Sequence, residues 1–522
     1  MRPRVAWSAC RCTRTSPQRI RSASSRHSAT QWPEPDAKEG HVLNRLVIPA
    51  RRLLPTHTFA RGVSVLVGGT AGAQLLAIAA APLLTRLYAP EDFGLLAVYG
   101  GLLALFTVVA SGRYQLAIPL PETQREAAEV LALSLAVVAM TTLLALLLVL
   151  LGGKALAEAL GVPSLNHWLW LLPLGVAFAG GYQAVSHWAV RTRAFSALAS
   201  TRIKQSLALL AIQLVASPLG GGGLLLGHAA GQGAGTLTLA RPAVSAIGEH
   251  RVTAAGMWAA ACRYRKFPLL SSWSGLFNTL GKQLPPLLFA ALFSPVAAGL
   301  YALAHRVLAM PMTLIGEAVG KVFFASAAEA HRQGELGQLV ARVHAILAQL
   351  AIPPVLILIA VGSDLFALVF GERWREAGEF ARWMAPWLYL VFITSPLSHL
   401  FSVMERQGQG LIFQSLLLGV RVAAIAVGAL RDDLLLTVAL FSLGSAACWT
   451  GFLVWIARLT DNPPRVLATA TLTALGWGVA LLAPLLAASW LAPVWLPWSA
   501  ALLLSAVLLG VRYVFLLRRA YQ

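Results

Sequence analysis

The chain has 522 residues, of which 57% are hydrophobic and 12% are charged, and its formal net charge at pH 7 is +20. A soluble domain carries about 25% charged residues, so this composition excludes a soluble enzyme with one core. Four cysteines are too few for a disulfide scaffold. Repeated apolar runs of about 20 residues indicate a polytopic membrane protein.

The basic excess alone does not indicate nucleic acid as a partner. Twelve of the basic residues lie in the first 61 residues, and membrane proteins gather Lys and Arg in their cytoplasmic loops. The sequence has no basic stripe interleaved with aromatic residues. We therefore expect a lipid bilayer around the chain and no nucleic acid.

Residues 1–60 form a segment rich in Arg and Ser, with no acidic residue before Glu34. Three interpretations stay open: a disordered basic tail, an organellar transit peptide, or upstream sequence translated from a misassigned start. In the third case translation would begin at Val42, Leu43 or Val47. We expect neither a fold nor a function for this segment.

From about residue 62 onward the chain divides into apolar segments separated by short polar breaks. We predict an all-α polytopic membrane protein with about 14 transmembrane helices. Residues 61–245 would form a first six-helix lobe, residues 246–460 a parallel second lobe, and residues 461–522 two additional transmembrane helices. The predicted spans are 62–84, 94–113, 130–151, 168–190, 203–218, 222–240, 269–292, 296–319, 344–369, 380–403, 411–430, 434–457, 466–490 and 494–517.

Loop charges predict the orientation. Outside residues 1–61, the connections assigned to the cytoplasm hold 20 basic residues and the outward connections hold 6. This asymmetry places both termini in the cytoplasm. Every outward connection is short, so we expect no outward catalytic domain and no enzyme. The cysteines and histidines have no zinc spacing, and we expect neither a metal nor a cofactor.

A short motif occurs twice. The segment from Leu87 to Ala97 and the segment from Leu292 to Ala302 share the pattern Leu-aromatic-small-Pro-x-x-x-Gly-Leu-x-Ala, with Pro90 and Pro295 separated by 205 positions. Each copy lies at the outward turn that begins the second span of a lobe. Proline suits the first turn of a helix, and glycine permits close approach of two backbones. Six spans separate the copies, which predicts two parallel lobes around an axis normal to the membrane.

Two basic residues are predicted near the membrane midplane. Lys282 lies about 21 Å into the seventh span and Arg306 about 15 Å into the eighth, from opposite faces of a core about 30 Å thick. A charge at a helix centre costs about 2.5–3.5 kcal/mol, so each must face a cavity or a partner. Asn278, Gln283 and His305 lie beside them in sequence. We predict a cationic cavity that binds an anionic head group.

Several assignments stay open. Lys282 and Arg306 could instead pair with Glu317 or Asp364, and His305 could be an ordinary buried histidine. Arg421 is a third basic residue inside a span, with either role. Arg113 lies near the cytoplasmic face, where it lines the cavity mouth or extends to the lipid head groups. The first six spans hold no mid-membrane carboxylate, which favours a negatively charged cargo over a cationic drug.

Several segments resemble one known family. They are Leu84 to Gly94, Arg113 to Ile118, Tyr264 to Pro268, Gly299 to Leu303 and Phe370 to Gly378. Together they are similar to bacterial lipid-linked oligosaccharide flippases, the O-antigen and polysaccharide translocases of the multidrug/oligosaccharidyl-lipid/polysaccharide exporter superfamily. The similarity extends from about Phe59 to Arg458.

The resemblance implies a two-lobed helical fold with alternating access. The cargo would be an undecaprenyl-pyrophosphate-linked oligosaccharide, moved across the bacterial cytoplasmic (inner) membrane for O-antigen, capsule or exopolysaccharide synthesis. A proton or Na⁺ gradient is the candidate driving force, and a polysaccharide polymerase and a chain-length regulator are candidate partners. The alternatives are a cation-coupled multidrug exporter of the same superfamily, a membrane polymerase or ligase, and a scaffold without transport.

Overall fold

The computed structural model describes residues 57–311, 315–404, 406–490 and 498–521. Over this part of the chain every regular element is a helix, so the predicted all-α class is confirmed. Residues 1–56 of the predicted tail lie outside the described residues, and residues 57–60 already belong to the first helix.

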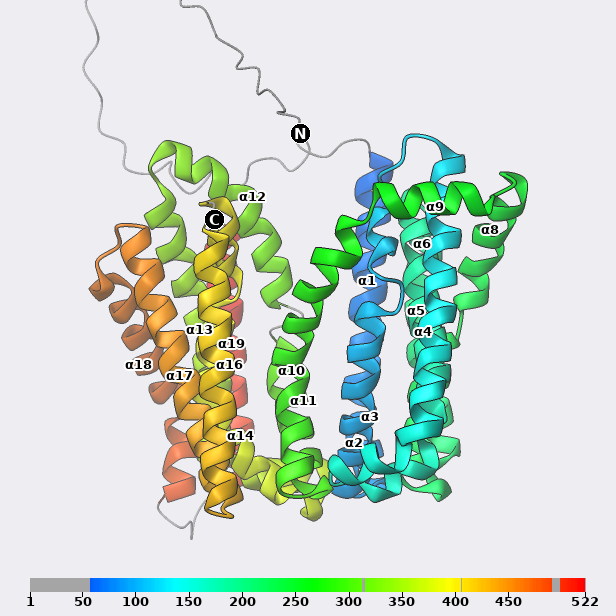
Figure 1. Cartoon of the computed structure of the whole chain (residues 1–522). Helices are drawn as coiled ribbons and strands as arrows, with labels where there is room; N and C mark the ends of the chain where they lie inside the picture. Colours follow the sequence, from blue (N-terminus) through cyan, green and yellow to red (C-terminus); the bar gives the residue numbers. More distant parts are fainter. Residues whose placement is uncertain (1–56, 312–314, 405, 491–497, 522) are drawn as a thin grey trace, which may run out of the picture. The chain divides into compact units, whose positions relative to one another are not determined.

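The predicted first lobe is built from α1 to α8 (Figure 1). The helix bounds are α1 His57–Ala79, α2 Ala81–Leu87, α3 Pro90–Val109, α4 Gln124–Ala159, α5 Leu171–Arg191, α6 Phe195–Val215, α7 Gly221–Gly233 and α8 Thr236–Glu249. Short turns η3 (Tyr114–Ala117), η4 (Pro163–Trp168) and η5 (Ser217–Leu219) connect some of them. Helix α9 (Ala254–Arg263) follows in the predicted cytoplasmic loop.

The second half of the chain begins with η6 (Phe267–Ser271), which leads into α10. Its helices are α10 Ser272–Leu292, α11 Pro295–Pro311, α12 Glu317–Gln333, α13 Leu336–Phe370, α14 Arg375–Thr394, α15 Leu400–Val403, α16 Gln407–Leu430 and α17 Leu434–Leu459. The turn η8 (Glu372–Trp374) lies between α13 and α14, and η9 (Pro396–His399) lies before α15. The final pair is α18 (Pro464–Trp490) and α19 (Trp498–Tyr521).

Ten of the predicted spans each fall on one described helix, with different ends. The other four are divided: 62–84 covers parts of α1 and α2, 222–240 covers α7 and the start of α8, 296–319 extends beyond α11 into α12, and 380–403 covers α14, η9 and α15. Among the described residues, seven helices are individually long and apolar enough to cross a membrane. The 36-residue α4 and the 35-residue α13 continue well beyond their predicted spans into the flanking polar sequence. Helices α8, α9 and α12 were not predicted as separate elements, because amphipathic loop helices give no long apolar run.

Local sequence explains several helix starts. Thr123, Thr253 and Asp433 cap α4, α9 and α17, each accepting a hydrogen bond from a backbone N–H three residues later. Prolines begin α3 and α11, where the missing N–H costs nothing. These signals fix where each helix begins and therefore the depth of its side chains.

Helices pack on one another within each half of the chain and also across the two halves. In the first half, α5 packs on α4 and α7, while α6 packs on α1 and α7; in the second half, α14 packs on α11, α13 and α17. Helix α3 contacts both α10 and α11, and α18 packs on α13 (Figure 1). The lobe boundaries stay a prediction.

Exposed leucines on α4 indicate a surface that faces lipid. Leu143, Leu147 and Leu151 are all exposed, and the last is 80% exposed. A continuous exposed apolar face of this kind marks a surface that water does not contact in the native environment.

Candidate functional site

The α10–α11 hairpin places Lys282 and Arg306 at the same level. Lys282 precedes the end of α10 by ten residues, and Arg306 follows the start of α11 by eleven. At 1.5 Å per residue each lies about 15 to 17 Å from the turn between the helices. Both side chains are exposed. We call these two residues the hairpin cations.

Neither hairpin cation has an ion-pair partner in the part of the chain that the structure describes. The ion pairs found there join other residues. Asp364, one of the two carboxylates considered as a partner, pairs with Arg375 instead. The side chain of Glu317, the other candidate, lies outside the described residues. These two exposed cations are therefore available to an anion.

One face of α10 carries polar groups between Lys282 and the first turn of the helix. Gly275, Asn278 and Lys282 are spaced by three and four residues, which places them on the same side of the helix. Asn278 is exposed, whereas Gly275 is buried. Gln283 is half-buried, and as the residue after Lys282 it lies on a neighbouring face of the helix.

Arg113 contacts this face from the first half of the chain. It follows α3 in the left-handed region, with φ of 61°, which is uncommon for a residue with a side chain. Its guanidinium packs on Gly275, where any Cβ would collide with it. Its Nε is buried and has no hydrogen-bond partner among the described residues. The structure thus brings Arg113 to α10, about two helical turns from Lys282.

His305 and Arg421 belong to a different environment, the aromatic cluster of the second half. The His305 ring stacks between Tyr301 and Trp387, at centroid distances of 5.7 and 6.2 Å. The Arg421 guanidinium lies 5.0 Å from the Trp387 ring centroid and 5.2 Å from that of Phe441.

Arg421 is also hydrogen-bonded inside this cluster. Its Nε donates to Ser445 Oγ at 3.1 Å, and its side chain is half-buried. Cation–π contacts and this hydrogen bond give the charge a stable environment within the protein. The structure therefore places Arg421 and His305 in the same aromatic cluster. Arg421 differs from the exposed hairpin cations because it is half-buried and has partners within the protein.

Sequence reasoning missed His228 and Trp387. His228 on α7 lies edge-on to Tyr99, with ring centroids 6.0 Å apart. The only sequence signal for His228 was a polar residue within a Gly-rich span. Trp387 gave no signal that would separate it from other buried tryptophans.

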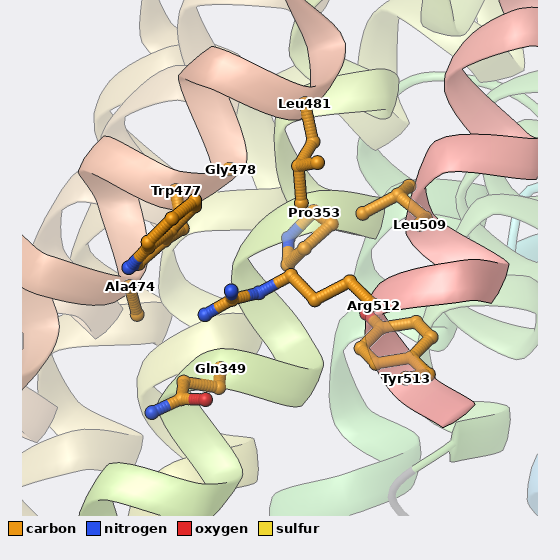
Figure 2. A pocket seen from close by; sticks show the side chains of 9 residues that line it. All are labelled: Gln349, Pro353, Ala474, Trp477, Gly478, Leu481, Leu509, Arg512 and Tyr513. Atoms are coloured by element: carbon orange, nitrogen blue, oxygen red, sulfur yellow. The ribbon is translucent and has the colours of Figure 1, made fainter. Parts of the chain in front are cut away.

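A small pocket lies elsewhere, between α13, α18 and α19. Figure 2 shows Arg512 extending from α19 toward Trp477 and Gln349, and its guanidinium carbon is 4.2 Å from the Trp477 ring centroid. Tyr513 donates a hydrogen bond to the Leu350 carbonyl at 3.2 Å. The residues lining this pocket include none of the predicted site residues. Within the described residues, no cluster of His, Cys, Asp and Glu could hold a metal ion.

The sequence matches a family model described as "Polysaccharide biosynthesis protein" over residues 83–379. The matched region includes every predicted site residue except Arg421. A comparison with curated protein sequences gives no match.

Two solved structures share the fold. Lipid II flippase MurJ in an inward closed conformation superposes with a TM-score of 0.67 at 11% identity, covering 88% of this chain and 99% of that one. An inward-facing multidrug resistance MATE family transporter of the MOP superfamily gives a TM-score of 0.53 at 13% identity, covering 80% and 97%. At these identities the likeness concerns the fold.

Proposed function

The chain belongs to the polysaccharide biosynthesis protein family and has the fold of the MOP-superfamily transporters, and from this premise we propose that it is a flippase for a lipid-linked oligosaccharide. The cargo is an undecaprenyl-pyrophosphate-linked repeat unit, which the protein moves across the bacterial cytoplasmic membrane. Both termini lie in the cytoplasm in this proposal. No covalent bond is made or broken.

The observation that carries the proposal is the pair of exposed hairpin cations without ion-pair partners among the described residues. A charge inside a span costs about 2.5–3.5 kcal/mol, so two unpaired charges at one level indicate a function. A pyrophosphate supplies the complementary anion, and Arg and Lys bind phosphate oxygens through charge-assisted hydrogen bonds. Asn278 and Gln283 offer amide groups to sugars at the same site.

The chemistry of the cargo explains why such a site is needed. Moving a charged sugar-pyrophosphate through hydrocarbon without help would require removal of its water, at a cost of tens of kcal/mol. A hydrated site with fixed cations lowers this barrier while the prenyl chain stays in lipid. Rocking of the two lobes would then open the site to one side at a time.

The test uses the purified full chain in liposomes with a fluorescent undecaprenyl-pyrophosphate-linked oligosaccharide. We expect Lys282→Ala and Arg306→Ala each to slow flipping at least about tenfold, since a lost hydrogen bond to a charged group is worth about 1.5–3 kcal/mol. The matched control is Lys154→Ala, an exposed cation of α4, which should flip at the wild-type rate. Wild-type rates in both hairpin variants would remove these residues from the site.

The same liposomes discriminate the rival function. A multidrug exporter is a second candidate because a multidrug transporter shares the fold. Transport of ethidium, together with no flipping of the labelled lipid, would favour the exporter. A gradient of protons or Na⁺ imposed across the same vesicles tests the driving ion.

A further inference from the structure

The repeated motif lies where the two halves of the chain meet. Pro90 begins α3 and Pro295 begins α11, and these two helices pack on each other. Both prolines lie at the end of the helices remote from the first residue of α1, which we call the distal end. The repeat therefore places two equivalent helix starts side by side.

The contact between the two helix starts is reciprocal. A Cβ added to Gly94 would collide with the carbonyl oxygen of Pro295, and a Cβ added to Gly299 would collide with the carbonyl oxygen of Pro90. The second added Cβ would also lie 2.9 Å from the backbone nitrogen of Gly94. Each glycine is one helical turn beyond its own proline and faces the other proline. This is the pattern of a self-complementary contact around a two-fold axis.

Trp374 of η8 adds a second link at the distal end. Its ring is fully buried and lies edge-on to Phe93, with centroids 4.9 Å apart. Its Nε1 donates a hydrogen bond to the carbonyl oxygen of Thr85 at 2.9 Å. Thr85 is in the last turn of α2, where carbonyl groups lack partners within the helix. Arg375 holds η8 in place through its ion pairs with Glu372 and Asp364.

The two halves are in direct contact at the distal end, but no strong electrostatic interaction among the described residues opposes their separation. Within the described residues, no ion pair joins the first half to the second at the distal end. The contact consists of backbone surfaces, apolar rings and one hydrogen bond whose two groups water can solvate after separation. Such a contact excludes polar cargo when closed and leaves no unpaired buried charge when open.

We propose that this distal contact, formed by Pro90, Gly94, Pro295, Gly299, Thr85 and Trp374, is the outward gate of the transport cycle. It rests on the proposed function in two respects: the alternating opening of the two ends, and the cytoplasmic position of the termini, which makes the distal end the outer one. The residues of three segments used for the family resemblance thus close the distal end, whereas the hairpin cations lie about 15 Å away along the helices. Cargo release requires the Gly94 and Gly299 helix starts to move apart.

The experiment measures the distance across the distal end in the full chain. Spin labels are placed at Ser164→Cys and Arg431→Cys, both exposed positions, after Cys10, Cys12, Cys262 and Cys448 are replaced by serine. Pulsed electron resonance in liposomes then gives the distance distribution. We expect Gly94→Ala and Gly299→Ala each to raise the ratio of open to closed populations about tenfold.

Two further variants sharpen the result. Gly100→Ala on the same helix adds a Cβ that meets nothing within 4 Å and should keep the wild-type distances. The double variant Gly94→Ala/Gly299→Ala should add little to either single one, because both methyl groups open the same contact. Trp374→Phe keeps the ring and removes the hydrogen bond, so it should shift the distances less than the glycine variants do.

Unchanged distances in both glycine variants and in Trp374→Phe, at normal membrane levels, would overturn the gate. If the glycine variants are lost from the membrane, the distances in Trp374→Phe test the proposal by themselves, and wild-type distances in that variant would overturn it. The liposome flipping assay is separate from these distances. A wild-type protein that flips no lipid but opens at the distal end in the glycine variants would refute the proposed cargo and keep the gate.

Discussion

Helix α11 carries both Gly299 of the distal contact and the hairpin cation Arg306, but only the glycine is repeated in the first half of the chain. Gly299 has the equivalent residue Gly94 at the same offset of 205 positions. Arg306 has instead the equivalent Gly101, which is buried, with its added Cβ 3.3 Å from Leu287 of α10. At this position of the repeat the first half has a buried glycine that packs on α10, whereas the second half has an exposed arginine.

This difference separates two requirements. A contact between two lobes needs matched backbone surfaces, so both copies keep proline and glycine. A single charged head group needs only one set of cations, so the charge occurs in one copy. If this asymmetry serves the cargo, changing the charge at position 306 must affect transport more than changing the charges elsewhere.

Reversing the charge at the asymmetric position should have the largest effect. Arg306→Glu places a carboxylate where we propose that the pyrophosphate binds. We expect flipping of the labelled lipid to fall at least about a hundredfold, since the variant loses a charge-assisted hydrogen bond worth about 1.5–3 kcal/mol and adds repulsion between like charges. Initial flipping rates in liposomes measure the change.

The control is Lys154→Glu, an equal charge reversal at an exposed position of α4, which should leave flipping at the wild-type rate. Flipping that is unaffected by Arg306→Glu would mean that the asymmetry has no role in transport.

Changing Arg421 should have an intermediate effect, mainly on stability. Arg421→Met keeps much of the side-chain length but removes the hydrogen bond to Ser445 and the contacts with Trp387 and Phe441. The expected loss is about 1.5–3 kcal/mol of unfolding free energy, from about 0.5–2 for the cation–π contacts and about 1 for the hydrogen bond. Thermal unfolding in detergent measures it, with Arg421→Lys as the variant that retains the charge.

A different outcome would move Arg421 to the cargo site. If Arg421→Met unfolds at the wild-type temperature and flips as poorly as Arg306→Ala, the aromatic cluster binds cargo and the separation drawn between the two cation environments is wrong.

The smallest effect concerns the ion pair that holds η8. The Arg375 guanidinium, by hydrogen bonding to Glu372, holds the pKa of that carboxyl below its usual range. A lowered pKa contributes stability that is present above the ordinary carboxyl pKa and is lost as the pH falls through the lowered value. Because the pair is exposed, the contribution is small.

The measurement compares unfolding temperatures of the wild type and Glu372→Gln. The difference should stay constant from about pH 8 to pH 6 and disappear only in acid, below the ordinary carboxyl range. Glu376→Gln, one turn further, is the control. A difference that already disappears near pH 6 would contradict the lowered pKa.

Hydropathy was enough to predict the helical spans, because each needs about 20 apolar residues. Loop helices such as α8 and α12 escaped prediction, since their apolar residues lie on one face only. The common level of Lys282 and Arg306 followed from counting residues along two adjacent helices. The aromatic environment of Arg421 did not, because Trp387, Phe441 and Ser445 come from separate helices.

The repeated motif could be predicted only in part from the sequence. The positions of Pro90 and Pro295 predicted two equivalent helix starts. The pattern could not reveal that Gly94 faces the other proline, because a linear motif carries no information about which helix faces meet. Trp374 was visible only as part of a family segment, and its partner Thr85 is almost 300 residues earlier.

The last two helices have a practical consequence. In the described part of the chain, α18 and α19 pack mainly on α13, α17 and each other, and Arg512 and Tyr513 join α19 to this group. If the second lobe rocks, this pair must travel with it as a passive attachment. A fluorophore on α19 would then report the motion of that lobe without touching the cargo path.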